Sequence, residues 1–249
     1  MRLVNFLLTS RSIYTRIAFV KWRLDHLTTR LSDHPNPMHP LTPDAIESIH
    51  QASLRILNET GVILTHPEGR ERLFEAGARL AGGRVCLPPD LVEWALSQPP
   101  ERFTLHGRDG KTATLGDGSL HWHNLGGARQ VYEPEAGVCR PATLQDVRDS
   151  ARLLDALDNV TTVTPFFTPQ DTPGALLSLA MYRHSLPHTI KPLHGPGVQT
   201  AAEVAFIARL AAVIGPPGQA LSLGISPISP LNFPDDVVAA ILETARLGI

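Results

Sequence analysis

The chain has 249 residues, of which 43% are hydrophobic and 18% are charged, with a formal net charge of −2. This composition is typical of a globular protein that can bury a sizeable core, and the charge gives no general attraction to nucleic acid or anionic lipid. The two cysteines, Cys86 and Cys139, lack CxxC spacing. Neither a disulfide framework nor a zinc finger is therefore indicated, and we expect a protein of the reducing cytoplasm.

Residues 1–40 form a basic extension that differs from the rest of the chain. Only two acidic residues accompany its six basic ones, which are Arg2, Arg11, Arg16, Lys21, Arg23 and Arg30. Such a bias fits a disordered extension, an upstream start codon with Met38 as the true beginning, a transit peptide, or a helix at a membrane surface. Its apolar pieces are too short to cross a bilayer, so we expect no membrane partner.

Residues 41–118 predict an N-terminal cap subdomain of helices and small strands. A helix is expected from Thr42 as N-cap to Gly61, with one apolar face formed by Ile46, Ile49, Ser53, Ile56 and Leu57. A second helix should start near Pro67, bury Leu73 and Phe74, and stop at Gly77. The other expected elements are a strand at 84–87, a helix at 89–96, and paired strands at 103–106 and 112–115.

The stretch 119–146 predicts a strand, a loop that contains a β-hairpin, and a helix. Residues 120–123 are β-prone and end on Asn124-Leu125-Gly126-Gly127, where the backbone can turn freely. A hairpin is expected from 128–132 and 138–140, followed by a helix capped by Thr143 with Asp146 in its first turn. The apolar face of that helix should be Val147, Ala151, Leu154 and Leu157.

Strands and helices alternate over the rest of the chain. Strands are expected at 160–165, 189–193 and 220–226, and helices at 173–185, 200–213 and 234–247, the second with a Thr200/Glu203 capping box. This alternation indicates parallel strands with helical crossovers. We therefore predict an α/β fold in which residues 119–249 form about four β/α units of a partial (β/α)₈ barrel, with two open edges.

Reactive groups of parallel α/β folds lie where the strands end. The candidate substrate-binding residues are His123, Asn124, Phe166, Phe167, Thr168, Lys191, His194 and Ser226, and Ser229 is a further strand-end candidate. The two phenylalanines could offer ring faces to a quaternary ammonium or could be ordinary core residues. Lys191 could be a nucleophile, a Schiff-base former or a carboxylate anchor, or it could lie along the surface toward solvent.

Two further motifs have alternative interpretations. His121 and His123 form an HxH pair that could chelate a metal on one side of a strand, as in amidohydrolases, or could be an ordinary polar strand end. His184, His188 and His194 need not converge, because a helix end separates them. The segment 194–197 leads toward a helix and could hold an anion, although it matches neither a P-loop nor a dinucleotide fingerprint.

Several long segments together resemble the trimethylamine methyltransferase family, in the family's order. They include IESIHQASLRILNETGV (46–62), RVCLPPDLVEWAL (84–96), PPERFTLHGRD (99–109), LGGARQVYEPEAGVCRPATLQD (125–146) and IKPLH (190–194), with LFEAGA (73–78) between the first two. The likeness is expected over 41–249, as roughly the first half of a family member, and not over 1–40.

The resemblance implies a (β/α)₈ barrel that transfers a methyl group from a methylated or quaternary amine to the cobalt of a corrinoid. The corrinoid belongs to a separate, cognate protein, so no cofactor or metal is expected to be bound directly by this chain. Desolvation and alignment of a poor leaving group are what such a pocket would contribute. The resemblance also implies that a later part of the barrel holds further site residues, so we expect no activity from this chain alone.

Two other classes of function remain open. The HxH pair would suit a metal-dependent barrel hydrolase, which purified protein should reveal as stoichiometric zinc that is lost on His123→Ala. Alternatively, the chain could be a non-catalytic protein that pairs its exposed strand edges with a partner or with a second copy of itself.

Overall fold

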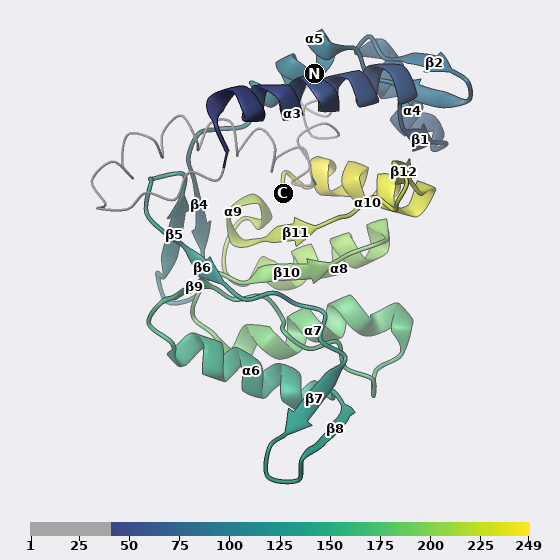
Figure 1. The fold of residues 1–249 in the computed structure, drawn as a ribbon. Coiled ribbons are helices and arrows are strands. Elements are labelled where there is room, and N and C mark those ends of the chain that lie inside the picture. Colours follow the sequence, from purple (N-terminus) through teal and green to yellow (C-terminus); the bar gives the residue numbers. More distant parts are fainter. Residues whose placement is uncertain (1–40) are drawn as a thin grey trace. The chain divides into compact units, whose positions relative to one another are not determined.

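The computed structural model describes residues 41–249, so the predicted extension 1–40 lies outside the described residues (Figure 1). The described chain is mixed α/β and divides into two compact units. The first unit holds 41–100 and Ile225–Leu242, and the second holds Glu101–Gly224 and Glu243–Ile249. The predicted domain boundaries at residues 40 and 118 remain predictions.

The first helix of the first unit begins where predicted but buries a different face. Thr42 accepts a hydrogen bond from the Ala45 amide and caps α3 (Pro43–Arg55), which continues as the π-helix η1 (Ile56–Thr60) and ends at Gly61 with φ 69°. Ile49 and Ile56 are both 48% exposed, so their predicted burial is wrong, whereas Leu57 of the predicted face is buried. The buried residues are His50, Leu54 and Leu57, spaced i, i+4, i+7, and His50 is satisfied by a hydrogen bond to Glu93.

The next helices of this unit confirm the predicted start and stop signals. They are α4 (Pro67–Glu75), which is followed by Gly77 at φ 103°, and α5 (Pro89–Leu96). Leu73 is buried as expected, but Phe74 is 37% exposed and stacks under the Arg70 guanidinium, so its predicted burial is wrong. An aromatic ring can lie at a surface when a cation covers it.

Short strands link the first unit's two chain segments. β1 (Ile63–Leu64) pairs in parallel with β12 (Asn232–Phe233), while β2 (Arg79–Ala81) and β3 (Arg84–Cys86) form an antiparallel hairpin. The final helix, α10 (Asp235–Arg246), sends Val238 and Leu242 into a core with Leu57, Leu73 and Val85. β2 was not predicted, because its three residues are all exposed and lack an apolar pattern.

The second unit contains both predicted hairpins. β4 (Phe103–His106) and β5 (Thr112–Leu115) pair antiparallel at the predicted bounds, and β7 (Gln130–Glu133) pairs with β8 (Val138–Pro141). α6 (Leu144–Ala156) follows with the capping box of Thr143 and Asp146. Val147 and Ala151 are buried as predicted, whereas Leu157 lies at the helix end, 46% exposed.

Four strands of the second unit run in parallel in chain order. β6 (Trp122–His123) pairs with β9 (Val160–Thr162), a bridge from Val163 to Leu193 continues to β10 (His194–Gly197), and β10 pairs with β11 (Ser222–Gly224). The connections are α6, then α7 (Leu177–Ser185), which packs on β10, and then α8 (Ala201–Ala211) with the predicted Thr200/Glu203 box (Figure 1). Across residues 41–249 the strands do not close into a barrel.

The strand predicted at 189–193 is wrong, because β10 begins at His194. The amides of Ile190 and Lys191 donate to the Asp155 carboxylate, and the Thr189 carbonyl accepts from Arg108. Side chains thus occupy the backbone groups that a strand ladder needs, and Pro192 has no amide hydrogen to donate. The segment 194–197, predicted as an anion-holding loop, is therefore the strand itself.

The remaining elements are short. They are the 3₁₀ turns η2 (Gly174–Leu176) and η3 (Leu186–His188) at either end of α7, and α9 (Pro217–Ala220) before β11. None of the helices in the described part of the chain is both long enough and apolar enough to cross a membrane.

Candidate functional site: the polar face of the parallel strands

One face of the parallel strands in the second unit is polar. His123 is in register with Thr162, His194 with Ser222, and Val163 with Leu193. Side chains alternate between the two faces along a strand. Val163 and Leu193 therefore share one face, and their neighbours Thr162, Thr164 and His194 lie on the other. We call the resulting set the polar strand face, and its members are His123, Thr162, Thr164, His194 and Ser222.

The two histidines of this face lie close together although 71 residues of sequence, counted from His123 to His194, separate them. Their ring centroids are 6.5 Å apart with an interplanar angle of 67°. His123 is exposed, whereas His194 is half-buried and its Nδ1 lies 2.5 Å from the Ser222 hydroxyl oxygen. That contact orients the His194 ring, because Ser222 is itself 3% exposed and held within β11.

Thr164 is the buried member of the face that lacks a hydrogen bond. The residue is 9% exposed, and within residues 41–249 its Oγ1 meets no hydrogen-bond partner. Its backbone is fully used, since the Asn124 side chain accepts from the Thr164 amide and donates to the Thr164 carbonyl, at 2.9 and 2.7 Å. Asn124 therefore extends the β6–β9 ladder by one side-chain amide, which is a structural role.

An aromatic pair follows Thr164 along the chain. Phe166 and Phe167 are half-buried and meet edge to face, with centroids 4.8 Å apart at 79°. The Phe166 carbonyl accepts from the amides of Gly127 and Ala128, and the Thr168 amide donates to the Ala128 carbonyl. A Cβ on Gly126 would lie 2.8 Å from the Pro165 carbonyl oxygen, so glycine is what allows this close approach.

Lys191 forms a clasp with Asp155 rather than joining the polar strand face. The Lys191 ammonium donates to the carbonyls of Leu154, at 3.0 Å, and Leu157, at the carboxyl end of α6. Burial lowers the pKa of Lys191, partly offset by the charge of Asp155. Burial alone would raise the pKa of Asp155, but hydrogen bonds from Thr189, Ile190 and Lys191 lower it.

The predicted site residues thus divide into groups. His123 and His194 come together, with Asn124 beside them and the aromatic pair and Thr168 on the same segment as Thr164. Lys191 is engaged at the end of α6, and the exposed Ser226 belongs to the first unit, as does Ser229. Their roles in binding remain predictions.

The other histidines are engaged elsewhere. His121 precedes β6 and contacts Asp117, whose pKa hydrogen bonds from Ser119 lower to about 2. His184 accepts from the Arg148 guanidinium, while burial, followed by nearby arginines, lowers the pKa of both His184 and His188. Among the described residues, no group of three His, Cys, Asp or Glu side chains is placed to hold a metal ion.

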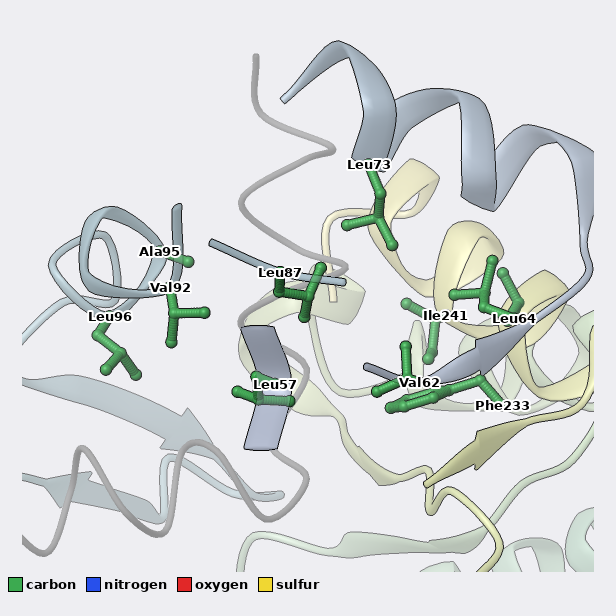
Figure 2. Close-up of a pocket in the computed structure, with 11 residues that line it drawn as sticks. Leu57, Val62, Leu64, Leu73, Leu87, Val92, Ala95, Leu96, Phe233 and Ile241 are labelled. Carbon is green, nitrogen blue, oxygen red and sulfur yellow. The ribbon is translucent and has the colours of Figure 1, made fainter. Parts of the chain in front are cut away.

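A separate cavity lies in the core of the first unit (Figure 2). Its volume is about 40 Å³, and its walls include Leu57, Leu73, Leu87, Val92 and Ile241. All eleven lining side chains are hydrocarbon, so the cavity offers no group that could orient a polar substrate. It is a packing space of the core and not the candidate site.

Sequence reasoning missed three residues of this region. Ser222, Thr164 and Asp155 carry ordinary side chains in β-prone or helical stretches, and no spacing distinguishes them. Their importance arises from partners far along the chain: Ser222 contacts His194, Asp155 contacts Thr189, and Thr164 is framed by Asn124. The only local signal was the end of a β-branched run at Thr164.

The parallel series of β/α units in chain order places the second unit among the α/β folds. The comparison with known sequences is more specific. The chain belongs to the trimethylamine methyltransferase (MTTB) family, whose sequence model matches residues 17–249. The family resemblance is thereby confirmed, but the expectation that it leaves out 1–40 is wrong from residue 17 onward.

Individual relatives support the same assignment. The chain is 29% identical over 216 residues to a glycine betaine methyltransferase of Desulfitobacterium hafniense, covering 84% of this chain and 45% of the relative. It is 27% identical over 215 residues to a trimethylamine methyltransferase of the same species, covering 83% and 43%. A trimethylamine methyltransferase of Methanosarcina mazei is 32% identical over 125 residues, covering 48% and 25%. The chain spans less than half the length of these relatives.

Proposed function

We propose that this chain takes part in the transfer of a methyl group from a methylated or quaternary amine to a corrinoid carried by a separate protein. Membership of the trimethylamine methyltransferase family over residues 17–249 carries the proposal. Relatives named as glycine betaine and trimethylamine methyltransferases support the amine class. In this proposal β6, β9, β10 and β11 are four strands of a (β/α)₈ barrel, and turnover requires the remainder of the relatives' length.

The polar strand face and the aromatic pair are the proposed amine site. A quaternary ammonium is attracted to the negative face of an aromatic ring, by about 2 kcal/mol or more when both are desolvated. Phe166 and Phe167 are half-buried and their rings meet edge to face, so each ring keeps a face that the other does not contact and that could meet a cation. The edge-to-face contact also holds both rings in place without a ligand.

The chemical role of these residues would be orientation and exclusion of water. During transfer a carbon–nitrogen bond breaks, its electron pair stays on nitrogen, and the methyl group bonds to the reduced acceptor. A bound amine must therefore present one methyl group outward while its other substituents are held. The rigid Asn124–Thr164 pairing and the His194–Ser222 contact would fix the walls against which those substituents rest.

Replacement of one ring tests this site. We expect Phe166→Ala to weaken binding of tetramethylammonium by about tenfold to thirtyfold, as measured by calorimetry, because one cation–π contact of about 2 kcal/mol is lost. Phe206→Ala is the matched control, since Phe206 is a 51% exposed phenylalanine of α8 in the same unit. Equal affinity of the two variants, with both folded by circular dichroism, would remove Phe166 from the site.

A further inference from the structure

Helix α3 and its continuation η1 carry apolar side chains beyond the face that the first unit buries. The buried face is formed by His50, Leu54 and Leu57. A second row follows the spacing i, i+4, i+7, i+11 and contains only alanine and isoleucine; we call it the outer stripe, and its members are Ala45, Ile49, Ala52 and Ile56. Both isoleucines of the outer stripe are 48% exposed. An exposed apolar row along a helix is typical of a contact surface.

The segment that precedes α3 in the chain has a matching apolar row. Its apolar residues recur at alternating steps of three and four, and they are Ile17, Val20, Leu24, Leu27 and Leu31. This heptad spacing is typical of a helix whose apolar side packs along a second helix. The family sequence model begins at residue 17, so this segment belongs to the part of the chain that the family shares.

The lengths of the two rows and of the connection between them agree. As a helix, 17–31 would span about 21 Å, close to the roughly 17 Å of the outer stripe. The ten residues 32–41 lead to the cap of α3 and include three prolines, which are unfavourable inside a helix and so favour a reversal of the chain. Extended, this connection reaches roughly 33 Å. It therefore holds 17–31 at a high effective concentration near the outer stripe.

Net charge distinguishes this segment from other occupants of the outer stripe. Residues 17–31 hold three basic residues and one acidic residue, whereas 43–60 hold three acidic residues and one basic residue. The opposite net charges attract the segment to α3, while two copies of α3 would bring like charges together. An anionic membrane would repel 43–60 for the same reason.

We propose that residues 17–31 dock as an amphipathic helix along the outer stripe, antiparallel to α3. The exposed isoleucines of α3 and η1 are then one side of an interface within the chain, and the basic segment is the other side. The inference goes beyond the proposed methyl transfer and does not depend on it.

Hydrogen–deuterium exchange of the full chain, read from peptides of 17–31, tests the docking. In the parent chain we expect the amides of this segment to exchange slower than an unstructured peptide by a factor of about ten or more. Ile49→Asp should remove this protection, because docking would bury a carboxylate without a partner. Gln51→Asp is the matched control and should keep the protection, since Gln51 is an exposed residue of α3 outside the outer stripe.

A second pair of variants leaves α3 unchanged. Leu24→Asp lies on the apolar row of 17–31 and should release the segment as Ile49→Asp does. Trp22→Asp is its control, because Trp22 would lie on the opposite side of the same helix and should keep the protection. Unchanged exchange in α5 shows that the first unit stays folded in each variant.

Fast exchange of 17–31 in the parent chain, or protection that Ile49→Asp and Leu24→Asp both leave intact, would overturn the inference. A dimer that Ile49→Asp dissociates, with 17–31 exchanging fast in the parent chain, would overturn it and assign the outer stripe to a second copy. Protection that appears only with anionic phospholipid vesicles would overturn it in favour of a membrane surface. None of these results bears on the proposed amine site.

Discussion

The clasp between Asp155 and Lys191 gives a prediction that separates a structural from a substrate-binding role for Lys191. The Asp155 Oδ1 atom accepts from Thr189 Oγ1 at 2.7 Å and from the Ile190 amide at 2.9 Å, and lies 3.4 Å from the Lys191 amide. A hydrogen bond to a charged group contributes about 1.5–3 kcal/mol, and half-exposed groups recover part of that from water. We therefore expect Asp155→Ala to lower the free energy of unfolding by about 2–3 kcal/mol.

The companion variants follow from the same geometry. Because all three donors point at Oδ1, Asp155→Asn can keep these bonds and should cost about 1 kcal/mol or less. Lys191→Met removes only the ammonium from the carbonyls at the end of α6, and should cost about 1 kcal/mol. For a chain of this length, 1 kcal/mol corresponds to roughly 2–4 °C in the unfolding midpoint.

Thermal unfolding followed by circular dichroism measures these differences. Lys111→Met is the control, because Lys111 is an exposed lysine in the turn of the β4–β5 hairpin and should shift the midpoint by less than about 1 °C. If Asp155→Ala changes the midpoint as little as the control, the clasp is not a source of stability. If Lys191→Met keeps its stability but loses amine binding, Lys191 belongs to the site.

Three further predictions concern pH, one close approach and one cap. The hydrogen-bonded Asp155 has a lowered pKa in the folded protein, so its stabilisation is present above the unfolded value of about 3.9 and is lost as the pH falls through the folded value. The difference in urea unfolding between the parent chain and Asp155→Ala should therefore shrink as the pH falls below about 4. Gly107→Ala should lower the free energy of unfolding by more than about 2 kcal/mol, because its Cβ would lie 2.2 Å from the Ile190 carbonyl oxygen. The control Gly215→Ala would meet no atom within 4 Å and should leave the free energy of unfolding unchanged in the same assay. Asp146→Ala should cost about 1–2 kcal/mol at neutral pH, because Asp146 accepts from Arg140 and completes the cap at Thr143; an unfolding curve that matches the parent chain would contradict the role of this cap.

The candidate site could be predicted only in part. Strand-end reasoning selected His123 and His194, and the structure brings them together, although His194 begins β10 instead of following a strand. The same reasoning gave Lys191 and Ser226 equal weight, although the first is bound to the end of α6 and the second lies in the other compact unit. A one-dimensional pattern states where a strand ends but not which neighbours occupy its polar groups.

Local chemistry determined the elements whose signals lie within a few residues. The caps at Thr42, Thr143 and Thr200 fixed three helix starts, because a side chain three residues from a free amide needs no distant partner. The bounds of the β4–β5 hairpin were also predicted correctly, because its turn and strand signals lie within a few residues. Family membership was also readable from sequence, because long segments kept their order.

Tertiary structure decided everything that depends on a contact between distant segments. It placed β10 at His194 because Asp155 and Arg108 take the backbone groups of 189–191, and it turned His50 rather than Ile49 into the core because Glu93 satisfies the imidazole. It also buried the Thr164 hydroxyl without a partner. Burial and hydrogen-bond satisfaction are sums over neighbours in space, so they are decided only when the chain has folded.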